Sequence, residues 1–283
     1  MQGTPSRATL KCERSNYEFF ALPPDEYPPL PEGKLGDQFR VDAKAFRDAA
    51  AAVTFAASGE EARGAVLMGT LLEIEGQTIT LVATDGYRLA RYELPLAEPS
   101  KTSARLIVPA RALAEVMRVA SGGVIEATVL GGQANQLVFN TGDVKVIARL
   151  VDGQYPNYPA VIPKEFDRKV TASTPRLLAS LRRAEVVAGD RASMVKLAAE
   201  GTSLVITASS DTAGNAYEEL DVERTGDPIT IAFNAKYLAE ILNHIDADTV
   251  SLELVGPVQP CAIKPNAGDR VGKQLYILMP LRQ

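Results

Sequence analysis

The sequence predicts an α+β fold in which one module, with antiparallel sheets and two helices on one face, is repeated along the chain. Three observations support this prediction. Segments with the alternating apolar and polar pattern of strands outnumber the helix-like segments. The second half of the chain repeats the order of the first half, and such repetition fixes the architecture. Hydrophobic residues make up 46% of the 283 residues, which is enough for packed cores.

The chain opens with a strand-like segment and a linker. In residues 8–23, every second residue from Tyr17 to Ala21 lies on one side of the expected strand, the period of a half-buried strand. The following residues are dense in proline and glycine, which favour extended and turn conformations. Because a lone strand cannot form a core, residues 1–30 are predicted to be the last strands of a domain, followed by a linker at 31–36.

The first complete module is predicted at residues 37–165. Its first helix covers 41–53, where Asp42 can act as the N-cap and the alanines favour helix. A strand and a second helix follow over 104–120, and a proline-rich connector at 154–167 ends the module. The remaining strand segments are predicted at 65–76, 77–96, 124–132, 135–142 and 144–153.

The second module, residues 166–283, repeats the first at an offset of 125 residues. Under this offset the segment LIVPARALAEVM from Leu106 matches IAFNAKYLAEIL from Ile231. The first helix of the first module, at 41–53, corresponds to residues 171–184. Two copies of one module are therefore predicted, each in the order helix, strands, helix, strands.

Composition limits the function and the compartment. The net charge of −5 argues against a general nucleic-acid binder, but it allows basic charge on one face. The cysteines, Cys12 and Cys261, stand in isolated contexts, which favours a reducing, cytoplasmic compartment. No apolar run is long enough to predict a membrane span, and the N-terminus lacks the pattern of a secretory signal. His244 lies near a predicted helix end, where a cation is favourable, and is assigned a structural role.

The sequence has no pattern that predicts catalysis, a cofactor or a metal site. It contains no phosphate-binding loop, no metal-ligand spacing and no nucleophile beside a base. Asp85 is the best-placed lone carboxylate, but its position before a glycine is explained by a turn. The alternative, an enzyme that uses Asp85 and Arg88 in a cleft between the modules, stays open here.

Four segments resemble the signatures of the bacterial DNA polymerase III β sliding clamp family, and they occur in that family's order. The resemblance covers essentially the whole chain. It implies a non-catalytic processivity factor and a ring of two chains around duplex DNA, with helices lining the hole. The family has three modules per chain, of which this sequence holds two and the last strands of the first. The segments are ALPPDEYPPLP (21–31), VATDGYRLA (82–90), LVDGQYPNYPAVIP (150–163) and YILMPLR (276–282).

The resemblance implies three kinds of partner. Duplex DNA would be bound without sequence preference. The DNA polymerase III catalytic subunit, the clamp loader and other clamp-binding proteins would dock through short linear peptides. A second copy would complete a homodimer when the chain has its full first module. An alternative is a truncated clamp that binds partner peptides but cannot close a ring on DNA. No membrane partner is expected.

The resemblance places a peptide groove between the two modules. Apolar side chains would receive the hydrophobic anchors of a peptide, while Arg88 and Arg282 would orient polar groups at the rim. Two positions depart from the family pattern, because Tyr87 stands where histidine is frequent and Ala160 where an arginine often flanks the pocket. The matched groove positions are Leu67, Thr84, Gly86, Tyr87, Arg88, Leu89, Pro156, Val161, Pro260, Ile277, Leu278, Met279, Pro280 and Leu281.

The resemblance also implies a DNA-facing surface and a ring interface. The ring interface would join Tyr17 and Phe19 of one chain to Val186 and Val187 of the other, head to tail. The alternatives are solvated helix faces for the basic residues and ordinary core positions for the interface residues. The basic residues expected to face DNA are Arg47, Arg111, Arg118, Arg176, Arg183 and Lys236.

Overall fold

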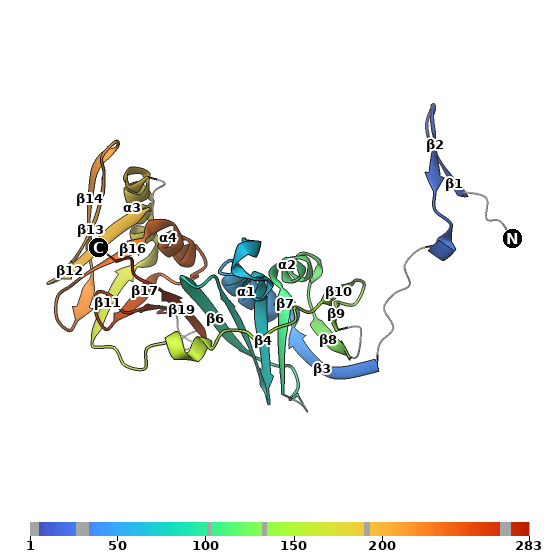
Figure 1. Cartoon of the computed structure of the whole chain (residues 1–283), viewed down its shortest axis with the longest axis horizontal. Coiled ribbons are helices and arrows are strands. Elements are labelled where there is room, and N and C mark those ends of the chain that lie inside the picture. Colours follow the sequence, from blue (N-terminus) through green and yellow to red (C-terminus); the bar gives the residue numbers. More distant parts are fainter. Residues whose placement is uncertain are drawn as a thin grey trace.

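The computed structural model describes residues 6–26, 34–100, 103–131, 135–189, 193–266 and 273–282. They form a hairpin and two modules, and Figure 1 shows the four helices on the inner side of the arc that the two modules make. The α+β class predicted from the sequence is confirmed, because helices accompany sheets whose strand pairs are antiparallel. Within these ranges, no helix is long and apolar enough to cross a membrane.

The first element is a hairpin, although the alternating pattern in residues 8–23 indicates one continuous strand-like segment. β1 (Ser6–Cys12) pairs with β2 (Ser15–Ala21), and Glu13 takes a positive φ of 50° in the turn. This turn lacks the Asn-Gly or Asp-Gly that usually signals a two-residue hairpin. The expected half-burial is also wrong, since every residue of β2 before Ala21 is exposed. The short helix η1 (Pro24–Glu26) follows.

The first module begins with β3 (Lys34–Asp42), which includes residues 34–36 of the predicted linker. These residues belong to the module because β3 pairs with β8 (Val124–Gly131) from its first residue. Residues 31–33 of the predicted linker lie outside the described residues. α1 (Ala43–Thr54) follows directly. The predicted N-cap is confirmed, because Asp42 Oδ1 accepts a hydrogen bond from the Ala45 backbone N–H at 2.8 Å.

Two sheets complete the first module, with strand orders β10-β9-β8-β3 and β6-β5-β4-β7. The residues 65–68, expected to begin a strand, instead form the short helix η3 (Ala65–Met68), because pairing with β7 begins only at Gly69. The other elements are η2 (Glu61–Arg63), β4 (Gly69–Glu75), β5 (Thr78–Thr84), β6 (Arg88–Pro95), β7 (Ala104–Pro109), α2 (Ala110–Val119), β9 (Gln136–Asn140), β10 (Lys145–Arg149) and η5 (Tyr158–Val161).

The second module repeats this arrangement, which confirms the predicted internal repeat. The order β14-β13-β12-β16 corresponds to β6-β5-β4-β7, and β19-β18-β17-β11 corresponds to β10-β9-β8-β3. Its elements are β11 (Arg168–Ser173), α3 (Thr174–Ala188), β12 (Met194–Glu200), β13 (Ser203–Ser210), β14 (Gly214–Asp221), β15 (Glu223–Thr225), β16 (Ile229–Asn234), α4 (Ala235–Asn243), β17 (Thr249–Leu254), β18 (Cys261–Pro265) and β19 (Gln274–Leu278).

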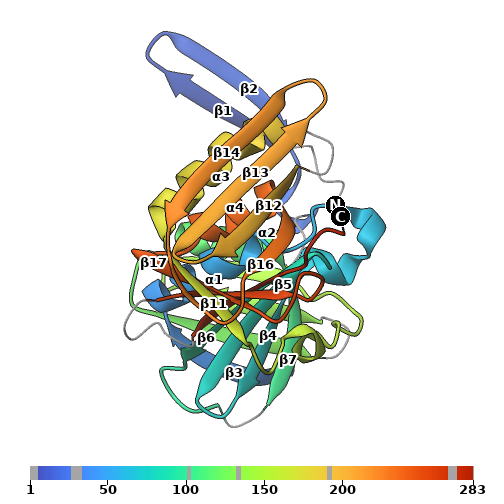
Figure 2. The same cartoon turned by 90° about the vertical axis from the view of Figure 1, so that its left-hand side faces the viewer.

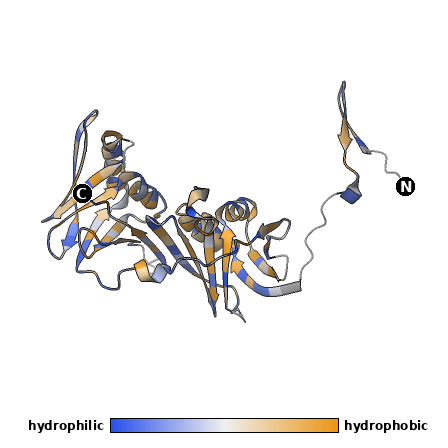
Figure 3. Cartoon of the chain, viewed as in Figure 1, coloured by the Kyte–Doolittle hydropathy of each residue, from blue (hydrophilic) through white to orange (hydrophobic). Residues whose placement is uncertain are grey.

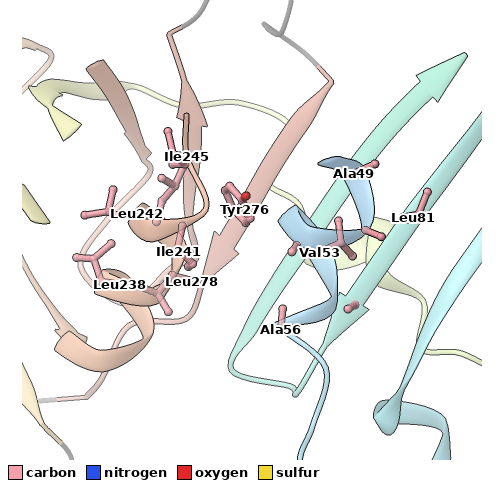
Figure 4. Close-up of a cluster of buried hydrophobic side chains, with 14 of the residues drawn as sticks. Ala49, Val53, Ala56, Leu81, Leu238, Ile241, Leu242, Ile245, Tyr276 and Leu278 are labelled. Carbon is pink, nitrogen blue, oxygen red and sulfur yellow. The ribbon is translucent and has the colours of Figure 1, made fainter. Parts of the chain in front are cut away.

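The two modules are joined edge to edge at β6 and β19. The pairing runs from Tyr92 with Gln274 to Arg88 with Leu278, so that nine strands form one sheet. Figure 4 shows buried residues of α1 on one side of this join and of α4 on the other, with Tyr276 of β19 between them. One continuous hydrophobic core therefore crosses the join.

The helices and a connector cover opposite faces of the sheets. In Figure 2, α3 and α4 lie behind the sheet β14-β13-β12-β16. Hydrophobic residues run along the strands beneath the helices (Figure 3), and these side chains form the main core. A smaller apolar cluster lies on the other face of the nine-stranded sheet, where Tyr155 and Tyr158 of the connector cover it. This second face carries the apolar base of the candidate groove.

Candidate partner-binding groove and DNA-facing surface

In the turn between β5 and β6, side chains form hydrogen bonds with the backbone of the same turn. Thr84 Oγ1 donates to the Arg88 carbonyl at 2.7 Å and accepts from the Gly86 N–H at 3.1 Å. Asp85 Oδ1 accepts from the N–H groups of Tyr87 and Arg88 at 2.9 and 3.0 Å. Gly86 has a φ of 89°, a conformation that favours glycine. Asp85 therefore has the turn role that the sequence predicts.

The end of the chain lies beside this turn. Met279 donates its backbone N–H to the Tyr87 carbonyl at 2.9 Å, and Leu281 donates to the Ala232 carbonyl of β16 at 2.8 Å. Residues 279–282, the tail, thus run from the turn of the first module to an edge strand of the second. Tyr87 and Met279 are large hydrophobic residues that are 47% and 37% exposed. Two apolar side chains from different modules are therefore presented to solvent together.

A buried apolar layer lies under the turn and the tail. Leu89 of β6 pairs with Ile277 of β19, and both belong to the cluster on the connector side of the sheet. Tyr155 closes this layer, and its hydroxyl donates to the Val82 carbonyl at 3.2 Å. Burial raises the pKa of Tyr155, so the hydroxyl remains a donor. The prediction that Leu278 lines the groove is wrong, because strand alternation turns its side chain into the core beneath the helices.

Arg88 is not at the rim of the groove, contrary to the prediction. Its side chain is 8% exposed. Nε donates to Asp85 Oδ2 at 3.2 Å, Nη1 to Glu240 Oε2 at 2.5 Å and Nη2 to the Phe55 carbonyl at 3.1 Å. The guanidinium also lies 4.5 Å from the centre of the Tyr237 ring. A buried guanidinium needs such partners, and these contacts occupy all three nitrogens.

Arg63 and Tyr237, which the sequence analysis missed, complete the surface around Tyr87. The Tyr237 ring stacks on Tyr87 with 6.2 Å between centroids, and the Arg63 guanidinium lies 4.5 Å from the centre of the Tyr87 ring. Arg63 Nη1 also donates to the Asp85 carbonyl at 2.8 Å. Burial raises the pKa of Tyr237, and the Asp85 carboxylate adds to this shift. One signal existed, because Tyr237 replaces Ala112 in the otherwise similar repeated helix.

The remaining groove positions lie on elements around this centre. Pro260 precedes Cys261, which pairs with Leu278 at the start of the tail. Pro156 and Val161 are exposed on the connector, as is Ala160, and Leu67 lies on η3. In the tail, Pro280 and Leu281 are half-buried and Arg282 is exposed. The turn, the tail and the buried layer are therefore joined by direct contacts. The predicted groove positions on the connector lie beside them.

The six basic residues expected to face DNA are all exposed on the four helices. Among them, Arg118 and Arg183 form ion pairs with acidic side chains. Arg118 pairs with Glu115 at 2.5 Å, and Arg183 pairs with Glu218 of β14 at 2.5 Å. The Arg183 guanidinium lowers the pKa of the Glu218 carboxyl, so this pair stays charged. Arg183 therefore offers less free charge than its exposure suggests.

The expected interface residues differ in exposure. Tyr17 and Phe19 lie on the exposed strand β2, with 6.3 Å between their stacked rings. Val186, at the end of α3, is 79% exposed. Val187 is partly buried against the main core. The core alternative thus fits Val187 and does not fit the other three.

His244 has the structural role predicted for it. It caps the C-terminus of α4, and its Nδ1 lies 2.8 Å from the Glu240 carbonyl oxygen. Its carbonyl accepts from Gln274 Nε2 at 3.0 Å, which ties the helix end to β19. Across the described ranges, no group of three His, Cys, Asp or Glu side chains could hold a metal ion.

Comparisons with known proteins agree with this geometry. Two family models match: that of the central domain of the DNA polymerase III beta subunit at residues 40–157, and that of its C-terminal domain at residues 159–282. The beta sliding clamp of Synechococcus elongatus is 32% identical over 100% of this chain and 75% of its own length. That of Staphylococcus aureus is 29% identical over 95% of this chain and 70% of its own.

Solved structures are similar as well. The sliding clamp (DNA polymerase III subunit beta) of Pseudomonas aeruginosa bound to griselimycin has a TM-score of 0.90 at 28% identity, over 98% of this chain and 74% of that one. The beta subunit of Thermotoga maritima has a TM-score of 0.87 at 28% identity, over the same shares.

Repeated α+β modules joined edge to edge, with the helices on one side, define a DNA clamp. The chain belongs to the DNA polymerase III beta subunit family, the bacterial beta sliding clamps. Its function is that of a non-catalytic processivity factor in DNA replication. The enzyme alternative is not supported, and the comparisons do not favour the alternative of a peptide-binding fragment.

Proposed function

We propose that this clamp holds its partners through a peptide groove at the join of the two modules. The observation that carries the proposal is the contact between the Tyr87 carbonyl and the Met279 N–H, which brings one exposed apolar side chain from each module to the same place. Leu89 and Ile277 give this place an apolar base. The partners would be the DNA polymerase III catalytic subunit, the clamp loader and other clamp-binding proteins.

The chemistry of this surface suits a short linear peptide. Met279 has a flexible, polarisable side chain that adapts to different hydrophobic anchors. Tyr87 and Tyr237 add aromatic area, and the exposed Arg282 can meet polar peptide groups. Contacts of this size typically give affinities around the micromolar range. The groove therefore binds several partners weakly, which allows them to exchange.

Calorimetry with the synthetic peptide Gln-Leu-Ala-Leu-Phe tests the groove. Deletion of Met279–Gln283 should abolish binding, because it removes the tail that carries the second wall. Val144→Ala, at an exposed valine in the turn between β9 and β10, serves as the matched control and should bind as the wild type does. Unchanged binding by the deletion variant would refute the assignment.

We also propose that the helix side of the arc faces duplex DNA. The support is the exposure of the basic residues on all four helices, in a chain whose net charge is negative. Attraction to phosphates needs only positive charge at loose spacing, so no base is read and the clamp can slide. We expect Arg111 and Arg176, near the starts of α2 and α3, to contribute most to the attraction for DNA.

The pairing of β6 with β19 supports a ring of two chains. The module that precedes β3 in the family would have to be complete for this ring to close. β14 is the counterpart of β6 in the second module, and within the described residues its outer edge is unpaired. When Leu22-Pro23 is aligned with Met279-Pro280, β2 corresponds to β19, and Phe19 occupies the position that corresponds to Tyr276. We infer that β2 of one chain pairs with β14 of another, as β19 pairs with β6.

The helix ends support the same interface. Phe55 follows the N-cap Asp42 of α1 by as many residues as Val186 follows Ser173 before α3. Phe55 packs on Tyr276 across the join, with 5.9 Å between ring centroids. Val186 of one chain would then meet Phe19 of the other. We further propose a cytoplasmic location and domains at 34–165 and 166–283, with residues 1–30 as the end of the first domain.

A further inference from the structure

The contact between Glu240 and Arg88 links the two modules beside the candidate groove. Glu240 lies on α4, and Arg88 begins β6, 152 residues away in sequence. The Arg88 side chain is 8% exposed, and that of Glu240 is 44% exposed. We propose that Glu240 is a positioning residue for the groove, which acts through Arg88. This inference rests on the proposed peptide groove, and it adds a residue that the groove itself does not contain.

Arg88 is attached firmly to the turn that carries Tyr87. Its backbone N–H and its Nε both donate to the Asp85 carboxylate, and its carbonyl accepts from Thr84. The Tyr87 carbonyl in turn accepts the Met279 N–H at 2.9 Å. A movement of Arg88 therefore displaces the turn, and the displaced turn releases the tail. The ion pair with Glu240 fixes this series of contacts to α4.

The same ion pair orients an aromatic side chain of the groove. Tyr237 and Glu240 lie three residues apart on α4, and such residues share one helix face. The guanidinium of Arg88 lies 4.5 Å from the centre of the Tyr237 ring, and this ring stacks on Tyr87. With Nη1 held by Glu240, the guanidinium plane keeps a fixed orientation over Tyr237. Glu240 thus stabilises both aromatic side chains without reaching the peptide.

Substitutions at these two positions have graded effects on the affinity for Gln-Leu-Ala-Leu-Phe. Glu240→Gln keeps the shape and one acceptor but loses the charge, so the affinity falls by about threefold to tenfold. Arg88→Lys loses the fork that reaches three partners, so the affinity falls by about tenfold or more. Because Glu240 acts through Arg88, the double variant binds within about twofold of Arg88→Lys alone.

Calorimetry measures these affinities, and amide hydrogen exchange of Met279 gives a second readout. In Glu240→Gln this amide exchanges faster, because its acceptor on Tyr87 is less well fixed. Arg168→Lys is the matched control. Arg168 is a largely buried arginine as well, with a side chain that is 20% exposed and paired with Asp167 at 2.7 Å, but it lies at the start of β11, which three strands separate from β6 in the sheet. This control changes stability and leaves the peptide affinity and the Met279 exchange as in the wild type.

Two results would overturn the proposal. One is wild-type affinity and wild-type Met279 exchange in Glu240→Gln. The other is additive losses in the double variant, which would mean that Glu240 contacts the peptide itself. The deletion of Met279–Gln283 separates this failure from failure of the groove. If the deletion abolishes binding while Glu240→Gln does not alter it, the groove stands and only the positioning role is refuted.

Discussion

The Phe55 ring at the end of α1 lies face to face with the His244 imidazole at the end of α4, with 4.0 Å between centroids and 7° between planes. These residues belong to different modules, so the stack joins the two helix ends on the inner side of the nine-stranded sheet. Tyr276 of β19 extends it, with its ring centroid 5.9 Å from that of Phe55. The join is thus held on one face by aromatic packing and along the strands by hydrogen bonds.

We expect Phe55→Ala to lower the free energy of unfolding by about 2 kcal/mol, because it removes a half-buried ring from the join. Urea unfolding measures this loss. Phe20→Ala, at a phenylalanine that is 81% exposed on the hairpin, is the control and should change stability by less than about 0.5 kcal/mol. Equal effects of the two substitutions would contradict the role assigned to Phe55.

Tyr158 makes stability fall at high pH. Burial, with a further contribution from its hydrogen bond to Glu73, raises the pKa of Tyr158 to about 12. The unfolded chain has a tyrosine pKa of about 10, so the folded state holds the proton more tightly. The stabilisation is complete below pH 10 and is lost as the pH rises towards 12, and a difference of two pKa units corresponds to about 3 kcal/mol.

Urea unfolding of wild type and Tyr158→Phe across this pH range tests the assignment. The phenylalanine variant should lose less stability than the wild type, because it has no hydroxyl to ionise. Some decline should remain, since burial also raises the pKa of Tyr155 and Tyr276. An equally steep decline in the variant would mean that Tyr158 does not contribute.

Much of the module could be predicted from the sequence because its signals are local. Asp42 before an alanine-rich stretch specifies a helix start, and the repeat from Leu106 to Ile231 specifies two similar modules. The hairpin of β1 and β2 was missed because Glu13 and Arg14 carry no turn signal. The pairing of β6 with β19 could not be predicted, since strand alternation says which face is buried and not which edge finds a partner.

The candidate site was only partly predictable for a related reason. The glycine of the turn and the apolar residues of the tail are visible in sequence. The burial of Arg88 depends on Glu240, which is distant in sequence, so a charged residue beside a turn was expected at the rim. Leu278 was wrongly assigned to the groove, because neighbouring residues of a strand point to opposite faces. Leu278 lies two residues from Tyr276, so both side chains point into the core beneath the helices.

Loss of arginines on the helices should weaken DNA binding without changing sequence preference. For the double variant Arg111→Ser and Arg176→Ser, we expect weaker binding to two unrelated duplexes by the same factor. The dependence of log affinity on log salt should become shallower by about one unit for each phosphate that the variant no longer neutralises. Fluorescence anisotropy over a salt series measures both. Arg149→Ser, on β10, is the control, and an equal effect there would mean that the helices are not the DNA-facing surface.

Photo-cross-linking can locate a bound peptide at the join of the two modules. A Gln-Leu-Ala-Leu-Phe peptide with a photoreactive final phenylalanine is irradiated with the chain, and the adducts are mapped by mass spectrometry. We expect adducts in residues 84–89 and 277–282 and on Tyr237. Adducts confined to the β1–β2 hairpin or to the turn between β9 and β10 would contradict the peptide groove at the join.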